Sequence, residues 1–335
     1  MFRSGRCRAC VAAAIVALSV VIGLAAACSG DDDGITLVAY TTPREVYEEL
    51  IPAFADGPAG EGVRVYQSYG PSGDQSRIVE SGLDADVVAL ALEPDIMRLV
   101  DEGLVDADWA GGPTAGFVSN SVVVLAVRPG NPEGVRDWDD LLRDDIEVIT
   151  PNPLTSGGAQ WNVAAAYGAQ LERGRTHEQA LEYLAAMFAN VDVQPKGSRE
   201  ALQIFRAGKG DVLIAYENEA ITARQNGEEV DYVIPDETIL IQNPIAVTSG
   251  SGNPAAAEAF VRHLLTPSSQ GVFADKGYRP VLPSVLAEHA EAFPEPPGLF
   301  TIEDVGGWDD FRSDFFSSDG YMVDIFAGDA PGDRR

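Results

Sequence analysis

Along most of the chain, segments with the hydrophobic pattern of a strand alternate with segments that have the hydrophobic pattern of a helix. Short runs of β-branched and aliphatic residues, such as residues 212–216, have the length and composition of buried strands. Such runs are followed by longer stretches with the apolar spacing or composition of a helix, as in residues 217–226. Because this order repeats from residue 35 onward, the sequence predicts an α/β protein with mostly parallel sheets flanked by helices.

The predicted elements cover most of the chain. The strands are expected at residues 35–40, 63–69, 86–92, 121–127, 146–149, 191–194, 212–216, 232–234 and 239–247. The helices are expected at residues 43–54, 72–81, 94–102, 138–142, 159–171, 177–189, 198–207, 217–226, 254–265 and 268–276. We expect the proline-rich residues 283–297 to wrap over the surface and residues 300–316 to end the chain with a helix.

Residues 1–27 have the pattern of a signal peptide, not of a folded domain. Three arginines precede an unbroken apolar run that ends in small residues. The junction Leu24-Ala-Ala-Ala-Cys28 resembles a bacterial lipobox, with its leucine one position farther from the cysteine than usual. We therefore expect an exported protein that is lipidated at Cys28, with residues 28–34 as an acidic tether at the outer side of the membrane or in the periplasm. A plain cleavable signal and an uncleaved anchor are the alternatives.

The overall charge and the rare residue types exclude several classes of function. The chain has 23 Lys and Arg against 52 Asp and Glu, a formal net charge of −29. A protein this acidic has no basic face for nucleic acid or for anionic lipid head groups. Its 3 histidines are scattered without the spacing of metal ligands, and no motif suggests a nucleophile or a cofactor. We therefore expect no metal, no cofactor and no catalytic reaction.

Four predicted strand-to-helix turns share one composition, a hydroxyl side chain beside glycine or proline. The turns are Thr41-Thr42-Pro43, Gly70-Pro71-Ser72-Gly73, Thr155-Ser156-Gly157-Gly158 and Pro195-Lys196-Gly197-Ser198. The first N–H groups of a helix have no intrahelical acceptor, and the helix dipole makes that end positive. Each turn alone is an ordinary helix start, for example with Thr42 as N-cap and Glu45 completing a capping box. Together, at the carboxyl ends of the strands, they predict an oxyanion site.

Longer motifs resemble one family of proteins. They are Tyr40–Glu45, Asp86-Val-Val-Ala-Leu-Ala91, Ile149-Thr-Pro-Asn-Pro-Leu-Thr-Ser-Gly-Gly-Ala159, Gly210-Asp-Val-Leu-Ile-Ala-Tyr-Glu-Asn-Glu-Ala220 and Phe300-Thr-Ile-Glu-Asp-Val-Gly-Gly-Trp308. In this order they resemble the sulfate-binding proteins of ABC importers, and the resemblance runs from about residue 35 to the last predicted helix. A thiosulfate-binding branch of the family shares most of these motifs.

The resemblance implies a periplasmic-binding-protein fold of type II. Such a protein has two α/β lobes joined by crossover strands, with the ligand in the cleft between the lobes and closure by a hinge. Residues 34–116 would form the first part of lobe 1, residues 117–240 lobe 2, and residues 241–335 the second part of lobe 1 with the C-terminal helix. The resemblance also implies a monomer that delivers its ligand to a membrane permease powered by a cytoplasmic ATPase.

The family's sulfate-binding positions fall on seven residues of this chain, which are Thr41, Ser72, Ser156, Gly157, Gly158, Ser198 and Tyr216. The resemblance implies backbone N–H donors at most of them, a hydroxyl donor at Ser156, and both kinds of donor at Ser72. The family more often has Asp, Ala and Trp at positions 41, 198 and 216. A backbone donor is unaffected by such a change, whereas a phenol at position 216 can also accept a hydrogen bond.

The phenol at position 216 leaves the choice of ligand open. Sulfate is the expected ligand, because a site with only donors leaves the O–H of a protonated oxyanion unpaired. Thiosulfate is the alternative, followed by molybdate or phosphate on the same fold. A different class of function, a hydrolase of sulfate or phosphate esters, would need catalytic groups that no motif supplies.

Charged side chains next to these turns are expected to have structural roles. We expect Arg44 and Arg199 to pair with carboxylates and fix the turns. Glu217 and Glu219 follow Tyr216 closely and are expected to cap the next helix or to lie between the lobes, because a carboxylate in contact with the anion would repel it.

Overall fold

The structure, a computed structural model, describes residues 34–329 and residue 331. The predicted signal peptide and the lipidation site Cys28 lie outside these residues, as does all of the acidic tether except Gly34. The strands are β1 (Gly34–Tyr40), β2 (Arg64–Gly70), β3 (Val87–Ala89), β4 (Phe117–Val127), β5 (Val148–Ile149), β6 (Val191–Val193), β7 (Val212–Tyr216), β8 (Asp231–Val233), β9 (Glu237–Val247) and β10 (Gly298–Phe300).

The helices follow the predicted order up to the C-terminal segment. The α-helices are α1 (Arg44–Ala55), α2 (Ser72–Glu80), α3 (Glu93–Asp101), α4 (Gly157–Glu172), α5 (His177–Ala189), α6 (Ser198–Arg206), α7 (Glu217–Gln225), α8 (Pro254–Leu264), α9 (Pro267–Asp275), α10 (Pro283–Glu288), α11 (Gly307–Phe316) and α12 (Tyr321–Ala327), and the 3₁₀ helices are η1 (Trp138–Leu142) and η2 (Ile302–Val305).

The C-terminal segment differs from the prediction. The proline-rich stretch was expected to wrap over the surface, and no helix was predicted in it, but it contains α10, which has a proline in its first turn. Proline suits this position because its fixed φ matches a helix and its missing N–H would have had no intrahelical acceptor. Residues 300–316 do not form one helix: β10, η2 and α11 share them, and α12 follows.

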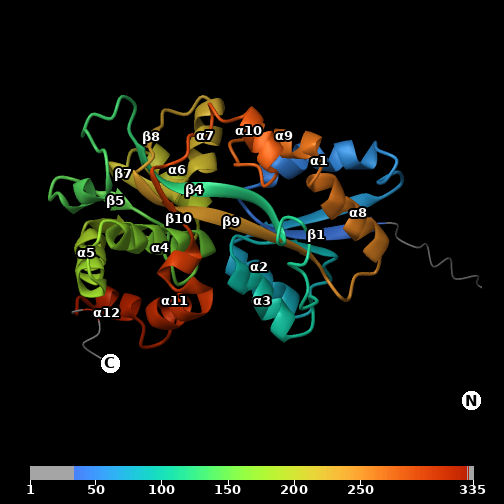
Figure 1. Ribbon diagram of the computed structural model, residues 1–335, viewed down its shortest axis with the longest axis horizontal. Helices are drawn as coiled ribbons and strands as arrows, with labels where there is room; N and C mark the ends of the chain where they lie inside the picture. Colours follow the sequence, from blue (N-terminus) through green and yellow to red (C-terminus); the bar gives the residue numbers. More distant parts are fainter. Residues whose placement is uncertain (1–33, 330, 332–335) are drawn as a thin grey trace, which may run out of the picture. The chain divides into compact units, whose positions relative to one another are not determined.

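The sheet joins two parallel groups of strands through two long antiparallel strands. The strand order is β2-β1-β3-β9-β4-β7-β5-β6, with β10 beside β9 and β8 beside β4. At one end β1 is parallel to β2 and β3, and at the other end β5 is parallel to β6 and β7. The strands β4 and β9 are antiparallel to each other and run across the middle of the view in Figure 1. Within each parallel group the carboxyl ends lie at one edge, which brings the strand-to-helix turns together.

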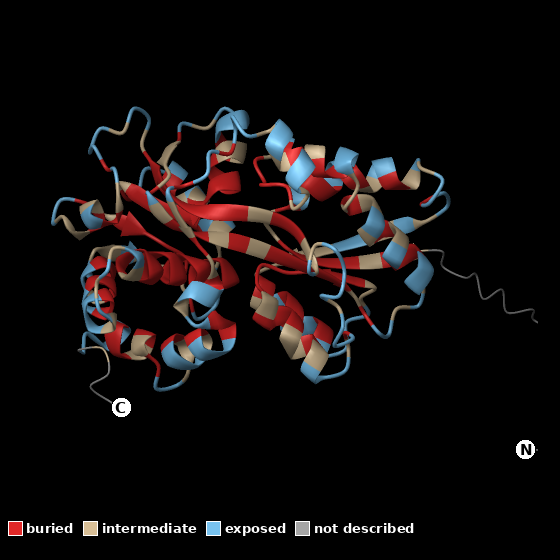
Figure 2. Ribbon diagram, in the orientation of Figure 1, coloured by how far each residue is buried: buried red, intermediate tan, exposed pale blue. Residues whose placement is uncertain are grey.

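Helices cover both faces of the sheet at each end (Figure 1). Strand β1 shows why, because its side chains alternate between two cores. Leu37 belongs to a core with Phe54 of α1 and Phe260 of α8, whereas Val38 belongs to a core with Leu99 of α3. Both faces of this strand are buried, and red also covers most of the central strands in Figure 2.

The C-terminal helices pack on α4 and α5. Trp308 of α11 meets Trp161 of α4 edge to face, with ring centroids 4.6 Å apart. Phe315 lies 4.9 Å from Tyr167 in the same way, and all four rings belong to one core. Helices α11 and α12 therefore pack with residues of the predicted second lobe, whereas the prediction grouped residues 241–335 as the second part of lobe 1 together with the C-terminal helix. The division into lobes itself remains a prediction.

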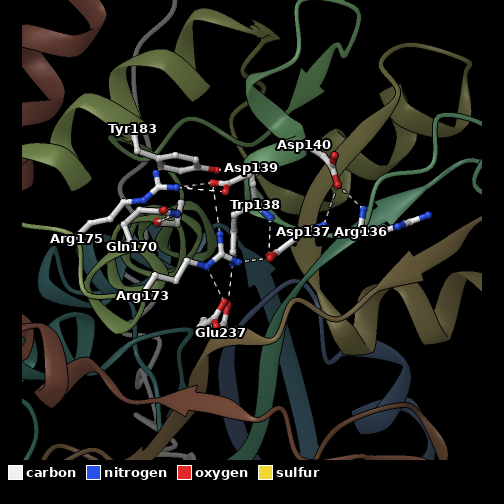
Figure 3. A network of polar contacts seen from close by, with 11 residues as sticks. Arg136, Asp137, Trp138, Asp139, Asp140, Gln170, Arg173, Arg175, Tyr183 and Glu237 are labelled. Atoms are coloured by element: carbon white, nitrogen blue, oxygen red, sulfur yellow. Dashed lines mark hydrogen bonds and ion pairs between the residues drawn. The ribbon is translucent and has the colours of Figure 1, made fainter.

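A network of ion pairs fixes the C-terminal end of α4 (Figure 3). Arg173 pairs with Asp137, the N-cap of η1, and with Glu237 at the start of β9 at 2.7 Å. Arg175 pairs with Asp139 at 2.9 Å. The network ties α4 to a long central strand, so the opposite end of α4, which begins at Gly157, is held in a defined position.

Candidate functional site

A cavity of about 300 Å³ lies where the strand-to-helix turns converge. All seven residues predicted to bind the anion line it, namely Thr41, Ser72, Ser156, Gly157, Gly158, Ser198 and Tyr216. They come from the ends of β1, β2, β5, β6 and β7, and the chain separates the first from the last by more than half its length. The structure therefore brings together every predicted site residue, and their contact with a ligand remains a prediction.

The starts of three helices supply most of this lining. Helix α2 begins at Ser72, α6 begins at Ser198, and α4 begins at Gly157 after the N-cap Ser156. Ser156 Oγ accepts the N–H of Ala159 at 3.4 Å, which leaves its own O–H to donate. The first N–H groups of these helices have no intrahelical acceptor, so the cavity is bordered by neutral donors and by the positive ends of helix dipoles.

The two glycines at the start of α4 lie where a side chain has no room. A Cβ on Gly158 would lie 2.7 Å from Ser198 Oγ and 3.6 Å from both Ser156 Oγ and Tyr216 Cε1. A Cβ on Gly157 would lie 2.6 Å from Leu92 Cδ2. Glycine therefore lets the chain bring its N–H groups close to the other donors.

The hydroxyl of Ser72 is already engaged by a buried carboxylate. Ser72 Oγ–H donates to Asp95 Oδ2 at 2.5 Å, and the same oxygen accepts the N–H of Ala91 at 2.9 Å. Asp95 is only 3 % exposed, and this burial raises the pKa of its carboxyl group, although the hydrogen bond from Ser72 opposes the shift. The hydroxyl donor expected from Ser72 is thus turned away from the cavity, and its N–H is the donor that remains.

Tyr216 lines the cavity and has a buried hydroxyl. The residue is 2 % exposed, and its phenol oxygen has no hydrogen-bond partner among the described residues. Burial raises the pKa of this phenol well above its ordinary value, so the group stays neutral and can donate a hydrogen bond. A buried hydroxyl without a partner costs about 1–3 kcal/mol, a loss that a bound anion would recover.

Charged side chains surround the rim of the cavity. Arg199 pairs with Glu45 at 3.0 Å and donates to the carbonyl of Thr41 at 3.4 Å, as expected for an arginine that fixes a turn. Arg44, expected to pair with a carboxylate, instead lies over the ring of Tyr69 at 4.7 Å.

Two other expectations for the rim need correction. Glu45 does not complete a capping box, because α1 begins at Arg44 after Pro43 and has no side-chain cap. Lys196 and Glu200 also line the cavity, so its lining includes a carboxylate, which the sequence did not lead us to expect. Glu200 accepts the N–H of Lys196 at 3.1 Å.

Of the two glutamates after Tyr216, Glu219 caps the next helix as expected, and Glu217 has a different partner. Glu219 Oε2 accepts the N–H of Tyr216 at 3.3 Å, which closes the first turn of α7. Burial raises the pKa of Glu219 to about 7. Glu217 forms a buried ion pair with Arg279 at 2.7 Å. Neither carboxylate lines the cavity.

Asp95 is the residue that sequence reasoning missed. It follows β3, so it too lies at a strand-to-helix turn. That turn reads Leu92-Glu93-Pro94 and contains no hydroxyl or glycine, so the composition that marked the other turns does not mark this one. Counting every strand-to-helix turn, whatever its composition, would have included it.

Neither a metal-binding cluster nor a membrane-spanning helix is present among the described residues. No group of three or more His, Cys, Asp and Glu side chains in residues 34–329 is arranged to hold a metal ion. In the same part of the chain, no helix combines the length and the apolar character that crossing a membrane would require.

A family model supports the resemblance given by the motifs. The model of the bacterial extracellular solute-binding protein family matches residues 35–279, most of the chain. The chain belongs to this family. The match covers β1 through α9 and includes every turn that borders the cavity. Membership in the solute-binding family also confirms the predicted fold class, an α/β sheet flanked by helices.

Individual members of the solute-binding family match over nearly their whole length. A sulfate-binding protein of Synechococcus elongatus is 42 % identical over 334 residues, which cover 94 % of this chain and 95 % of the relative. A thiosulfate-binding protein of Pseudomonas aeruginosa is 34 % identical, with 87 % of this chain and 91 % of the relative covered. Among solved structures, the sulfate-binding protein SubI from Mycobacterium tuberculosis is 46 % identical with a TM-score of 0.82, over 85 % of this chain and 99 % of that one.

Proposed function

We propose that the protein binds sulfate in this cavity and delivers it to the permease of an ABC importer, without a reaction of its own. The observation that carries the proposal is the convergence of seven predicted donor residues on one cavity, in a chain whose relatives include sulfate-binding proteins. The predicted donors are backbone N–H groups and the hydroxyls of Ser156 and Tyr216, all of them uncharged.

The strength of these donors is sufficient for a dianion. Burying a dianion without partners is prohibitive, so the protein must replace its water nearly bond for bond. A hydrogen bond to a charged group contributes about 1.5–3 kcal/mol, and a micromolar affinity requires about 8 kcal/mol. About four such bonds in excess of the ordering penalties are therefore enough, and the cavity has more donors than that.

Export and lipidation are part of the same proposal. An importer takes its ligand from outside the cytoplasm, which agrees with the predicted signal peptide and with a family described as extracellular. A thioether-linked diacylglycerol on Cys28, detected by mass spectrometry of the membrane fraction, would establish the anchor. Release of a Cys28→Ala variant into the soluble fraction would agree with it.

Calorimetric titration of the purified protein with sulfate, thiosulfate, molybdate and phosphate at neutral pH tests the ligand. We expect the tightest binding for sulfate and at least tenfold weaker binding for phosphate, whose O–H leaves a donor of the site unpaired. Tighter binding of thiosulfate would move the protein to the thiosulfate-binding branch. Phosphate binding as tight as that of sulfate would refute the assignment.

A further inference from the structure

A partly exposed ion pair bridges the two parallel groups of strands. Arg199 is the second residue of α6, which follows β6, and Glu45 is the second residue of α1, which follows β1. One nitrogen of Arg199, Nη2, lies 3.0 Å from Glu45 Oε1 and 3.3 Å from Glu45 Oε2. Because β1 and β6 belong to opposite ends of the sheet, the ion pair ties one end to the other.

The ion pair lies directly beside the predicted anion site. Arg199 lines the cavity and comes right after Ser198, one of the predicted donor residues. The same Nη2 donates to the carbonyl of Thr41 at 3.4 Å, and Thr41 is a predicted donor residue on the other side of the cavity. Glu45 is not among the lining residues of this cavity, but with Arg199 it lines a neighbouring cavity of about 80 Å³. Arg199 therefore connects the two sides next to the predicted position of the anion.

The two sides also touch at a second place around the cavity. Trp161 Nε1 on α4 donates to the carbonyl of Ala91 at 2.9 Å, and Ala91 lies just after β3. A Cβ on Gly157 would lie 2.6 Å from Leu92 Cδ2, so the start of α4 packs closely against the segment that follows β3. The cavity is therefore bordered by contacts that must separate if its two sides move apart.

We propose that Glu45 and Arg199 form a clamp across the cavity that prolongs the binding of the anion. The two sides separate when the anion leaves, and this separation breaks the ion pair, so the clamp slows dissociation. Glu45 is then a positioning residue, because it acts through Arg199 and does not touch the ligand. The inference rests on the proposed function and deepens it, since it assigns the rate of release to residues other than the donors.

Glu45 makes the clamp testable because its two effects on the anion have opposite signs. Its carboxylate is a negative charge near the cavity, so through space alone its removal should strengthen the attraction for the anion and slow its release. Loss of the clamp should have the reverse effect. An exposed ion pair strengthens the contact between its partners about twofold to fivefold, and salt screens it.

Stopped-flow fluorescence with sulfate, which measures association and dissociation separately, tests the clamp. In a buffer of low ionic strength we expect Glu45→Gln to release sulfate about twofold to fivefold faster than the original protein. Its association should be as fast as before or faster, because a repulsive charge is gone. At high salt the difference in dissociation should become smaller.

Two comparisons separate the clamp from a general effect of charge. Glu49→Gln is the matched control, because Glu49 also lies on α1 but pairs at 3.1 Å with Lys276 at the end of α9. Helices α1 and α9 share one core on the same side of the cavity, so this variant should release sulfate at the original rate. In an Arg199→Gln background, which already lacks the clamp, Glu45→Gln should leave dissociation unchanged or slow it, because only the effect through space remains.

The outcomes separate the clamp from the proposed function. If sulfate binds and Glu45→Gln releases it at the original rate or more slowly, the ion pair does not act as a clamp. The same conclusion follows if Glu49→Gln accelerates release equally, or if Glu45→Gln accelerates it equally in the Arg199→Gln background. If the unaltered protein binds none of sulfate, thiosulfate, molybdate and phosphate, the proposed function is wrong and the clamp is wrong with it.

Discussion

Gly158 gives the sharpest test of the cavity. The replacement Gly158→Ala adds one methyl group at the second position of α4, in the midst of the predicted donors. That methyl carbon would lie 2.7 Å from Ser198 Oγ, and 3.6 Å from Ser156 Oγ and Tyr216 Cε1. The side chain of Ser198 can rotate away, but the methyl group then occupies space that the anion needs next to the Gly158 N–H.

The expected effect on binding is large and the effect on folding is small. Displacement of the anion from two charge-assisted hydrogen bonds removes about 3–6 kcal/mol, a loss of at least roughly a hundredfold in affinity. Alanine in place of glycine in a helix favours folding by up to about 1 kcal/mol, which offsets part of the crowding. Isothermal titration calorimetry with sulfate, together with a thermal melt without ligand, measures both quantities.

Gly271→Ala is the matched control. Gly271 lies inside α9, and a Cβ there would meet no atom within 4 Å. This variant should be more stable by up to about 1 kcal/mol and should bind sulfate as the original protein does. If Gly158→Ala also bound sulfate within tenfold of the original affinity, the anion would not lie against the start of α4. The assignment of Gly157 and Gly158 as donors to the anion would then be wrong.

Three further predictions concern single side chains. Tyr216→Phe should weaken sulfate binding about tenfold in the same titration, because it removes a buried donor, and an unchanged affinity would show that the phenol does not touch the anion. Glu219 is neutral in the fold up to a pKa of about 7 instead of the usual 4.5, so the stability it contributes is complete below about pH 4.5 and is lost as the pH rises through 7. The free energy of unfolding of Glu219→Gln should therefore exceed that of the original protein by about 3 kcal/mol at pH 8 and equal it at pH 4. If urea unfolding gave the same difference between the two proteins at every pH in this range, the prediction would be wrong. Lys196→Ala should slow sulfate association at low salt while leaving dissociation unchanged in stopped-flow fluorescence, and a difference that persists at high salt would exclude an electrostatic cause.

The elements, and the residues that line the cavity, could largely be predicted because their signals are local. The turn Gly70-Pro71-Ser72-Gly73 and the run from Ser156 to Gly158 carry their helix starts in their own composition. Strands of a parallel group have their carboxyl ends at one edge, so local turns are enough to predict a shared site. The packing of α11 against α4 depends on rings more than a hundred residues apart along the chain, such as Trp161 and Trp308, and has no local signal.

The remaining differences come from long-range polar contacts that override local patterns. Glu45 has the spacing of a capping box, but an arginine 154 residues away binds it instead. Ser72 was predicted to donate its hydroxyl to the anion, but that hydroxyl donates its hydrogen bond to Asp95, 23 residues farther along. In both cases the local pattern offers a weak hydrogen bond, and tertiary structure supplies a charged partner that forms a stronger one.

The acidity of the whole molecule and the binding of an anion are compatible because they act over different distances. Screening limits the field of surface carboxylates to about 8 Å at physiological salt, whereas the donors of the cavity act at hydrogen-bond distance. At the rim, the lining contains Lys196, Arg199 and the carboxylate of Glu200, and Arg199 is already paired with Glu45. Selectivity then depends on acceptors and not on net charge. The carboxylate of Glu200 is the strongest acceptor in the lining for the O–H of a protonated oxyanion, so its distance from the ligand influences how strongly phosphate is rejected.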